Sequence, residues 1–94
     1  MSCEVTVLLF HSLRELAGAK EVKVTPELCT VAGLIEHFLM ERPGSREELM
    51  NADGEISSRY TIVVNQQVTP RELWKETTLS NGDEVAFLTM ITGG

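Results

Sequence analysis

The sequence predicts an α+β domain in which one main helix covers a mixed sheet of four to five strands. Strand-like apolar segments stand before and after a single strongly amphipathic helix. The stretch from Gly44 to Ser58 is polar and turn-rich, with one helical turn after Ser45, so it supplies no second full helix of the kind a ferredoxin-like arrangement needs. The 94 residues are enough for one core and not for two, so residues 1–94 are expected to form a single domain.

The first two strands are expected on either side of a short helical turn. Residues 4–10 (EVTVLLF) are rich in β-branched and apolar side chains, as in a central strand. Residues 20–25 (KEVKVT) alternate charged residues with valine, which indicates a strand with one face in water. Between them, Ser12 is a candidate cap for the helical turn, and Gly18 is a candidate for its end.

The main helix is expected to begin after Thr30, a suitable N-cap, and to stop before Pro43. Its large apolar residues recur at intervals of three and four, which places them on one face. They are Val31, Leu34, Ile35, Phe38 and Leu39. Burial of this face against the sheet is expected to stabilise the domain by roughly 1.5 to 3 kcal/mol per large side chain.

The remaining strands follow the polar stretch. Residues 59–65 (RYTIVVN) are typical of a strand, and Pro70 restricts the next one to a short edge strand near Val68. An Asn-Gly turn then leads into the last strand, on which Val85 and Phe87 share one face.

Composition excludes several classes of partner. The net charge is −6, and the eight Lys and Arg residues are scattered singly, which argues against nucleic acid binding. An acidic surface suits solubility or steering toward a partner with a basic face, and the sequence leaves both open. The longest apolar run, residues 7–10, is far too short to cross a membrane. Cys3 and Cys29 have no metal-binding spacing, so we expect free thiols in a reducing cytoplasm.

Catalysis by side chains is not expected. His11 follows a strand, and His37 lies off the apolar face of its helix. Neither has a Ser or Cys at a recognisable nucleophile spacing, so both are expected to be solvated. Residues 53–55 hold two carboxylates but lack the rest of a calcium loop, and residues 83–84 lie in a hairpin turn. The sequence therefore predicts no metal site.

The chain ends on MITGG, which contains no acid, base or usual nucleophile. Ala86, Leu88 and Met90 fall on the face of the last strand opposite Val85 and Phe87. Leu88 and Met90 form with Ile91 an apolar stripe that leads to two glycines, and a partner interface explains such a stripe better than a monomer does.

Three stretches of this sequence resemble the small subunit of molybdopterin synthase, a β-grasp, ubiquitin-like sulfur carrier. They are VLLFHSLRELAG (residues 7–18), VVNQ (residues 63–66) and LSNGDEVAFL…TGG (residues 79–94). The helix that begins TVAGLIEHF falls where this family has its own helix. The similarity covers essentially the whole chain and is weakest over residues 44–58. It implies a β-grasp fold with a C-terminal tail at residues 89–94.

The resemblance also implies a mechanism. The α-carboxylate of Gly94 would be adenylated by a ubiquitin-activating-like adenylyltransferase that uses ATP, and a sulfur donor protein would convert the adenylate into a thiocarboxylate. The tail, consisting of Met90, Ile91, Thr92, Gly93 and Gly94, would then insert into the large subunit of molybdopterin synthase and give sulfur to a pterin precursor. Glycine suits a narrow channel because it has no Cβ. The chain itself would bind no cofactor and would not be catalytic alone.

By position, the resemblance implies an interface with the large subunit. Phe10, Val68 and Leu88 match the family's apolar patch, and Arg14 matches an arginine beside it. Phe10 and Val68 are equally compatible with core or sheet-edge positions, whereas Leu88 is expected to face outward.

One departure from the family concerns the tail. Thr89 and Met90 stand where family members commonly have two prolines, which would fix φ and stiffen the tail. The departure leaves other acceptors open, namely sister carriers for thiamine synthesis, tRNA thiolation or protein conjugation. A β-grasp interaction module whose Gly-Gly has no role is the third alternative.

Overall fold

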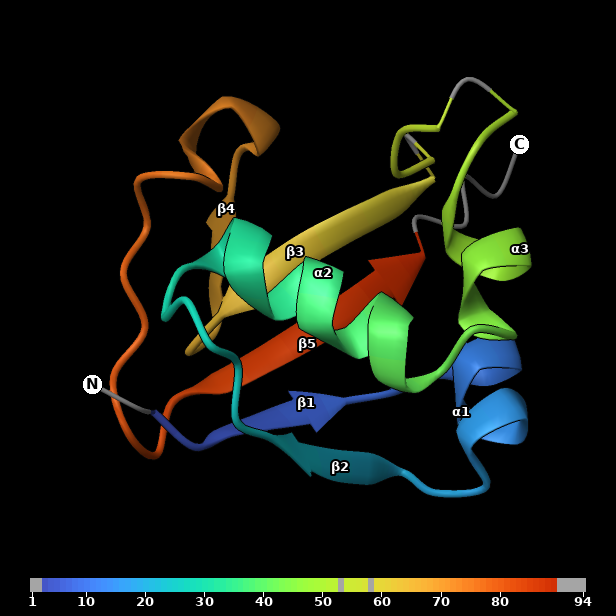
Figure 1. Ribbon diagram of the computed structural model, residues 1–94, viewed down its shortest axis with the longest axis horizontal. Coiled ribbons are helices and arrows are strands. Elements are labelled where there is room, and N and C mark those ends of the chain that lie inside the picture. The colour runs from blue at the N-terminus through green and yellow to red at the C-terminus, as the bar shows by residue number, and fades with distance from the viewer. Residues whose placement is uncertain (1–2, 53, 58, 90–94) are drawn as a thin grey trace.

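The structure, a computed structural model, describes residues 3–52, 54–57 and 59–89. These residues form a five-stranded sheet with three α-helices and one 3-10 turn. Figure 1 shows how the helices and strands are arranged in space. The elements in chain order are β1 (Val5–Leu8), α1 (His11–Ala17), β2 (Glu21–Val24), α2 (Val31–Glu41), α3 (Ser45–Leu49), β3 (Tyr60–Val64), β4 (Gln67–Thr69), η1 (Arg71–Leu73) and β5 (Glu84–Thr89). The predicted α+β class, with one main helix over a mixed sheet, is confirmed.

The sheet has the strand order β2-β1-β5-β3-β4. Strands β1 and β5 are parallel and adjacent in its centre, and the other neighbouring pairs are antiparallel. Strand β4 is a three-residue edge strand that contains Val68 and ends directly before Pro70, as the sequence predicts. The central pair therefore joins an early segment of the chain to a late one.

Helix α2 crosses one face of the sheet (Figure 1). Its N-cap is Thr30, whose side chain accepts a hydrogen bond of 3.0 Å from the Gly33 N–H, and the helix ends at Glu41, before Pro43. All five apolar residues predicted to face the sheet are at most 5% exposed. The ring of Phe38 meets the ring of Phe87 on β5 edge to face, with centroids 5.2 Å apart. Both predicted helix boundaries and the buried face are thus confirmed.

Helix α1 differs in part from the prediction. It begins at His11 with Phe10 as its N-cap residue, so the prediction that Ser12 caps the helix is wrong. The extended backbone of β1 continues to Phe10, and the helix starts directly after it. Gly18 ends the helix as predicted, with a φ of 71°, and its N–H donates to the Arg14 carbonyl over 2.9 Å. The predicted helical turn after Ser45 is confirmed as α3.

The cysteine prediction is wrong. Cys3 and Cys29 are joined by a disulfide, with their Cα atoms 6.1 Å apart. The two residues are 26 positions apart and form no local motif. Cys3 lies just before β1 and Cys29 lies in the loop before α2, and packing of α2 on the sheet brings these segments together.

No helix in the described part of the chain has both the length and the apolar character needed to cross a membrane.

Candidate functional site

The face of the sheet opposite α2 carries an apolar surface. Val7, Val85 and Phe87 point toward α2 and are no more than 1% exposed. Because successive side chains of a strand point to opposite faces, their neighbours in sequence lie on the other side. We call this surface the outer sheet face; its apolar members are Leu8, Phe10, Val63, Val68, Ala86 and Leu88.

Strand register aligns four of these side chains in one row. Leu8 on β1 pairs with Ala86 on β5, Ala86 pairs with Val63 on β3, and Val63 pairs with Val68 on β4. Directly paired residues on one face of a sheet have their Cβ atoms about 4.5 to 5.5 Å apart. The row is therefore a continuous apolar strip across four strands.

Phe10 and Leu88 extend this strip along the two central strands. Phe10 lies two residues beyond Leu8 with extended backbone angles, and Leu88 lies two residues beyond Ala86, opposite Thr61. Phe10 and Leu88 are half-buried, whereas Val68 is 66% exposed. The structure thus places Phe10, Val68 and Leu88 on one face, with Val68 on the edge strand and Phe10 outside the buried core.

Arg14 is held beside this surface by two contacts. Its Nε donates a hydrogen bond of 3.2 Å to the Leu9 carbonyl, and its guanidinium carbon lies 5.5 Å from the centroid of the Phe10 ring. A fixed cation at the rim of an apolar surface can pair with a carboxylate on a partner and set the partner's orientation.

Sequence reasoning missed two members of the outer sheet face, Leu8 and Val63, whereas alternation along the last strand predicts the outward position of Ala86 correctly. The run VLLF and the run IVV are apolar at every position, so alternation cannot tell which residues face outward. Two hydrogen bonds between Asn65 and Glu84 fix the register of β3 and β5. The Asn65 N–H donates to the Glu84 carbonyl over 2.8 Å, and the Glu84 N–H donates to the Asn65 side chain over 3.0 Å.

Strand β5 leads from the outer sheet face toward the predicted tail. The residues predicted to insert and react, Met90, Ile91, Thr92, Gly93 and Gly94, lie outside the described residues. The described part of β5 ends at Thr89, which pairs in register with Tyr60 on β3. The roles predicted for residues 90–94 therefore remain predictions.

Tyr60 anchors the end of this strand pair to α3. It is 5% exposed. Burial, followed by the charge of Glu48 and a hydrogen bond to it, raises the pKa of Tyr60 to about 12, and the nearby Arg59 acts in the opposite direction. The phenol is therefore neutral at physiological pH and links β3 to α3 through Glu48.

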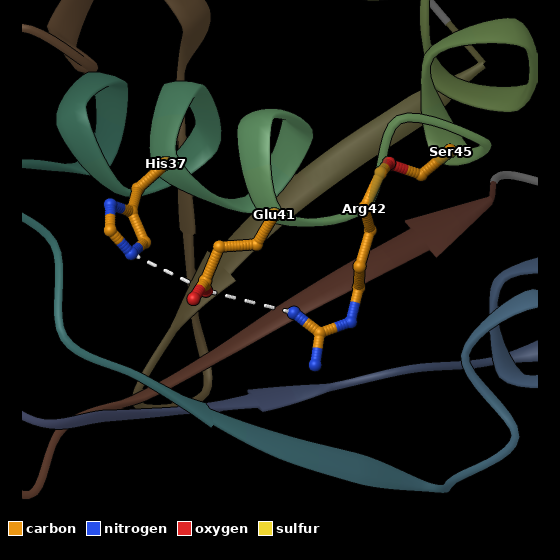
Figure 2. Close-up of polar contacts among 4 residues, drawn as sticks. All are labelled: His37, Glu41, Arg42 and Ser45. Atoms are coloured by element: carbon orange, nitrogen blue, oxygen red, sulfur yellow. Dashed lines mark hydrogen bonds and ion pairs between the residues drawn. The ribbon is translucent and has the colours of Figure 1, made fainter.

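One polar cluster near the C-terminus of α2 contains a histidine and a serine, but the two are not partners. Figure 2 shows His37 and Arg42 on either side of Glu41, with His37 Nε2 3.3 Å and Arg42 Nη1 3.8 Å from Glu41 Oε1. The Ser45 hydroxyl donates instead to the Arg42 carbonyl over 2.6 Å. The His37 side chain is thus partly exposed and lies beside a carboxylate rather than being fully solvated.

The other titratable candidates are either engaged or not described. The Asp83 carboxylate accepts from the Ser80 N–H over 2.8 Å and from the Asn65 side chain over 3.1 Å, which closes the turn before β5. Asp53 and the side chain of His11 lie outside the part of the molecule that the structure describes. Within that part, no three His, Cys, Asp or Glu residues are grouped so that they could hold a metal ion.

Comparison with known sequences gives matches over almost the whole chain. The model of the ThiS family matches residues 7–94. The molybdopterin synthase sulfur carrier subunit of Haemophilus influenzae is 29% identical over 96% of this chain and 99% of its own length. The subunit of the same name from Escherichia coli is 33% identical with the same coverage, 96% and 99%.

Solved structures agree with this result. Small archaeal modifier protein 1 of Haloferax volcanii superposes with a TM-score of 0.81 at 24% identity, over 97% of this chain and 99% of that one. The modifier protein of the same name from Methanosarcina acetivorans gives a TM-score of 0.79 at 25% identity, over 100% and 99%. The matches confirm the resemblance found in the sequence and the predicted ubiquitin-like β-grasp fold.

Proposed function

Because the chain belongs to the ThiS family and is similar throughout to molybdopterin synthase sulfur carrier subunits, we propose that it carries sulfur for molybdenum cofactor synthesis. The observation that supports this most directly is the arrangement of Phe10, Val68 and Leu88 on the outer sheet face. Strand β5 runs along this face toward the Gly-Gly end, so a partner bound there would receive the tail.

The proposed chemistry takes place on the α-carboxylate of Gly94. An adenylyltransferase related to ubiquitin-activating enzymes catalyses attack of this carboxylate on the α-phosphate of ATP, and pyrophosphate leaves. The terminal sulfur of a persulfide on a donor protein then displaces AMP and forms an acyl disulfide. A thiol reduces the S–S bond of that acyl disulfide and leaves a thiocarboxylate on Gly94, so the chain supplies a main-chain carboxylate and no catalytic side chain.

Delivery of the sulfur requires a second partner, the large subunit of molybdopterin synthase. In this proposal, the outer sheet face packs on an apolar surface of the large subunit, and Arg14 pairs with an acidic group at the rim. Residues Met90 to Gly93 pass into the active site of that subunit. Gly93 and Gly94 fit a narrow channel because they carry no Cβ.

We place this cycle in the cytoplasm, because the activation step consumes ATP.

Intact-mass spectrometry tests the carrier role. The purified chain is incubated with the activating enzyme, ATP and a persulfide donor, and a parallel sample omits ATP. We expect a species in which one oxygen is replaced by sulfur, and only when ATP is present; tandem mass spectrometry should assign the change to Gly94. If the complete mixture leaves the mass unchanged, the carrier proposal is wrong.

A charge on the outer sheet face tests the proposed partner. Leu88→Glu places a carboxylate in the apolar surface, where pairing with the large subunit would leave it buried without a cation, so we expect the dissociation constant to rise by at least about a hundredfold. Leu28→Glu is the matched control, since Leu28 is 62% exposed and precedes α2 on the other side of the sheet. Calorimetry with the large subunit should show loss of binding for the first variant and wild-type binding for the second.

A second candidate function is protein modification. The likeness to the Methanosarcina acetivorans modifier protein, at 25% identity over the whole chain, favours it. Activation of Gly94 would be the same, but the acceptor would be a lysine amine and the product an isopeptide bond. Lysine-linked remnants of this chain in cellular proteins would support this function, and their absence while thiocarboxylate accumulates would exclude it. Carriers for thiamine synthesis or tRNA thiolation differ only in the acceptor of the sulfur.

A further inference from the structure

A second apolar surface lies on the helix side of the domain, away from the outer sheet face. Leu28 in the loop before α2 is 62% exposed, and Met40 near the end of α2 is 73% exposed. Both line one groove of about 330 Å³. We call it the helix-side groove; Glu27, Leu28, Glu36, His37, Met40 and Glu41 line it.

The backbone at Leu28 packs closely on α2. A Cβ atom on Gly33 would overlap the Leu28 carbonyl oxygen and come within 2.9 Å of the Leu28 Cβ. The absence of a side chain at Gly33 lets the loop lie directly on α2, and the Thr30 N–H fixes the loop further by donating to the Leu28 carbonyl over 2.9 Å. The backbone at Leu28 is therefore held against α2, while 62% of the residue stays exposed.

Carboxylates dominate the charged groups of the groove. Three glutamates line it, and no Lys or Arg does. Glu41 lies between the side chains of His37 and Arg42, as Figure 2 shows. Among the described residues, none of the ion pairs involves Glu27 or Glu36, so both carboxylates are available to external cations.

We propose that the helix-side groove docks an amphipathic helical segment of another protein, with apolar anchors flanked by Lys or Arg. Leu28 and Met40 supply the apolar contact that such a helix seeks in a groove, and Glu27 and Glu36 complement its cations. The proposal is independent of the sulfur-carrier function. Since the groove and the outer sheet face lie on opposite sides of the sheet, both can be occupied at once.

The test is an NMR titration of the whole chain with a synthetic amphipathic helix of leucine and lysine. A peptide of equal length with glutamate in place of lysine is the control. We expect saturable shifts centred on the amides of Leu28, Glu36 and Met40 with the lysine peptide and none with the glutamate peptide. Shifts of equal size with both peptides, or shifts centred on the outer sheet face, would overturn the proposal.

Variants separate the groove from general attraction to an acidic protein. The double variant Leu28→Ser/Met40→Ser should weaken binding of the lysine peptide at least about tenfold. Leu16→Ser is the matched control, because Leu16 is 56% exposed but lies on α1, outside the groove, and it should bind as the wild type does. Glu27→Gln/Glu36→Gln should weaken binding and reduce its dependence on salt. Equal affinity in the Leu16 and groove variants would contradict the assignment.

Discussion

Tyr60, the chain's only tyrosine, allows its environment to be measured directly. Its pKa is about 12 in the folded domain and near 10 in an unfolded chain. Its raised pKa therefore contributes stability that is fully present below pH 10 and is lost as the pH rises toward 12. Absorbance titration of the tyrosinate band, with circular dichroism to follow folding, should give a native midpoint well above 10. A native midpoint near 10 would contradict the buried, Glu48-bonded phenol, and Tyr60→Phe should remove this part of the pH dependence of stability.

Gly33 gives a second prediction at the scale of a residue. Alanine normally favours a helix by about 1 kcal/mol over glycine, but here the new Cβ would meet a backbone carbonyl that cannot rotate away. We expect Gly33→Ala to lower the free energy of unfolding by roughly 1 to 3 kcal/mol. Urea denaturation measures this, with Gly44→Ala as the control, because a Cβ at Gly44 would have nothing within 4 Å and its φ is −63°. A Gly33 variant as stable as the wild type would show that the loop can move away from α2.

At the scale of elements, the disulfide ties the start of β1 to the loop that precedes α2. Closing a loop between residues 26 positions apart restricts the unfolded chain, and the expected stabilisation is about 3 to 4 kcal/mol. Reducing agent should therefore lower the Tm of the oxidised protein substantially. It should not affect Cys29→Ser, which lacks the bond. If the reductant left the oxidised wild type unchanged, the crosslink would contribute nothing to stability.

The elements differ in how far the sequence could predict them. The limits and buried face of α2 were predictable because an N-cap, a helical period and a proline are all local signals. The edge position of β4 followed from Pro70 in the same way. The disulfide and the membership of Leu8 and Val63 in the outer sheet face depend on which strands become neighbours. That information is absent from any single segment, so it could not be predicted from local pattern.

For the candidate site, the sequence predicted side chains but not their arrangement. Phe10, Val68 and Leu88 were each assigned through resemblance, and only the strand order brings them to one face. The start of α1 was also predicted wrongly. Ser12 is a good local cap, but the backbone is still extended at Phe10, and the helix begins directly after it at His11.

For the molecule as a whole, we expect different residues to determine stability and to carry out the proposed reaction. The hydrophobic core is built from residues between Cys3 and Phe87, all within the described part. Removal of Gly94 should leave the Tm within about 1 °C of the wild type, because glycine has no side chain to contribute to a core. The same variant should give no thiocarboxylate, since the carboxylate would be displaced by one residue from its place in the adenylating site. A large fall in Tm would show that the terminal glycine is structural.

The central pairing of β1 with β5 also governs how the domain comes into being. In chain order, these strands are the first and last of the described sheet. Without β5, β1 would pair with β2 alone. We expect pairing of such distant segments to slow folding. The loop between the two strands must close, at a cost in entropy, before their contacts can form. A chain still being translated cannot complete this core until residues 84–89 have been made and β5 can pair with β1.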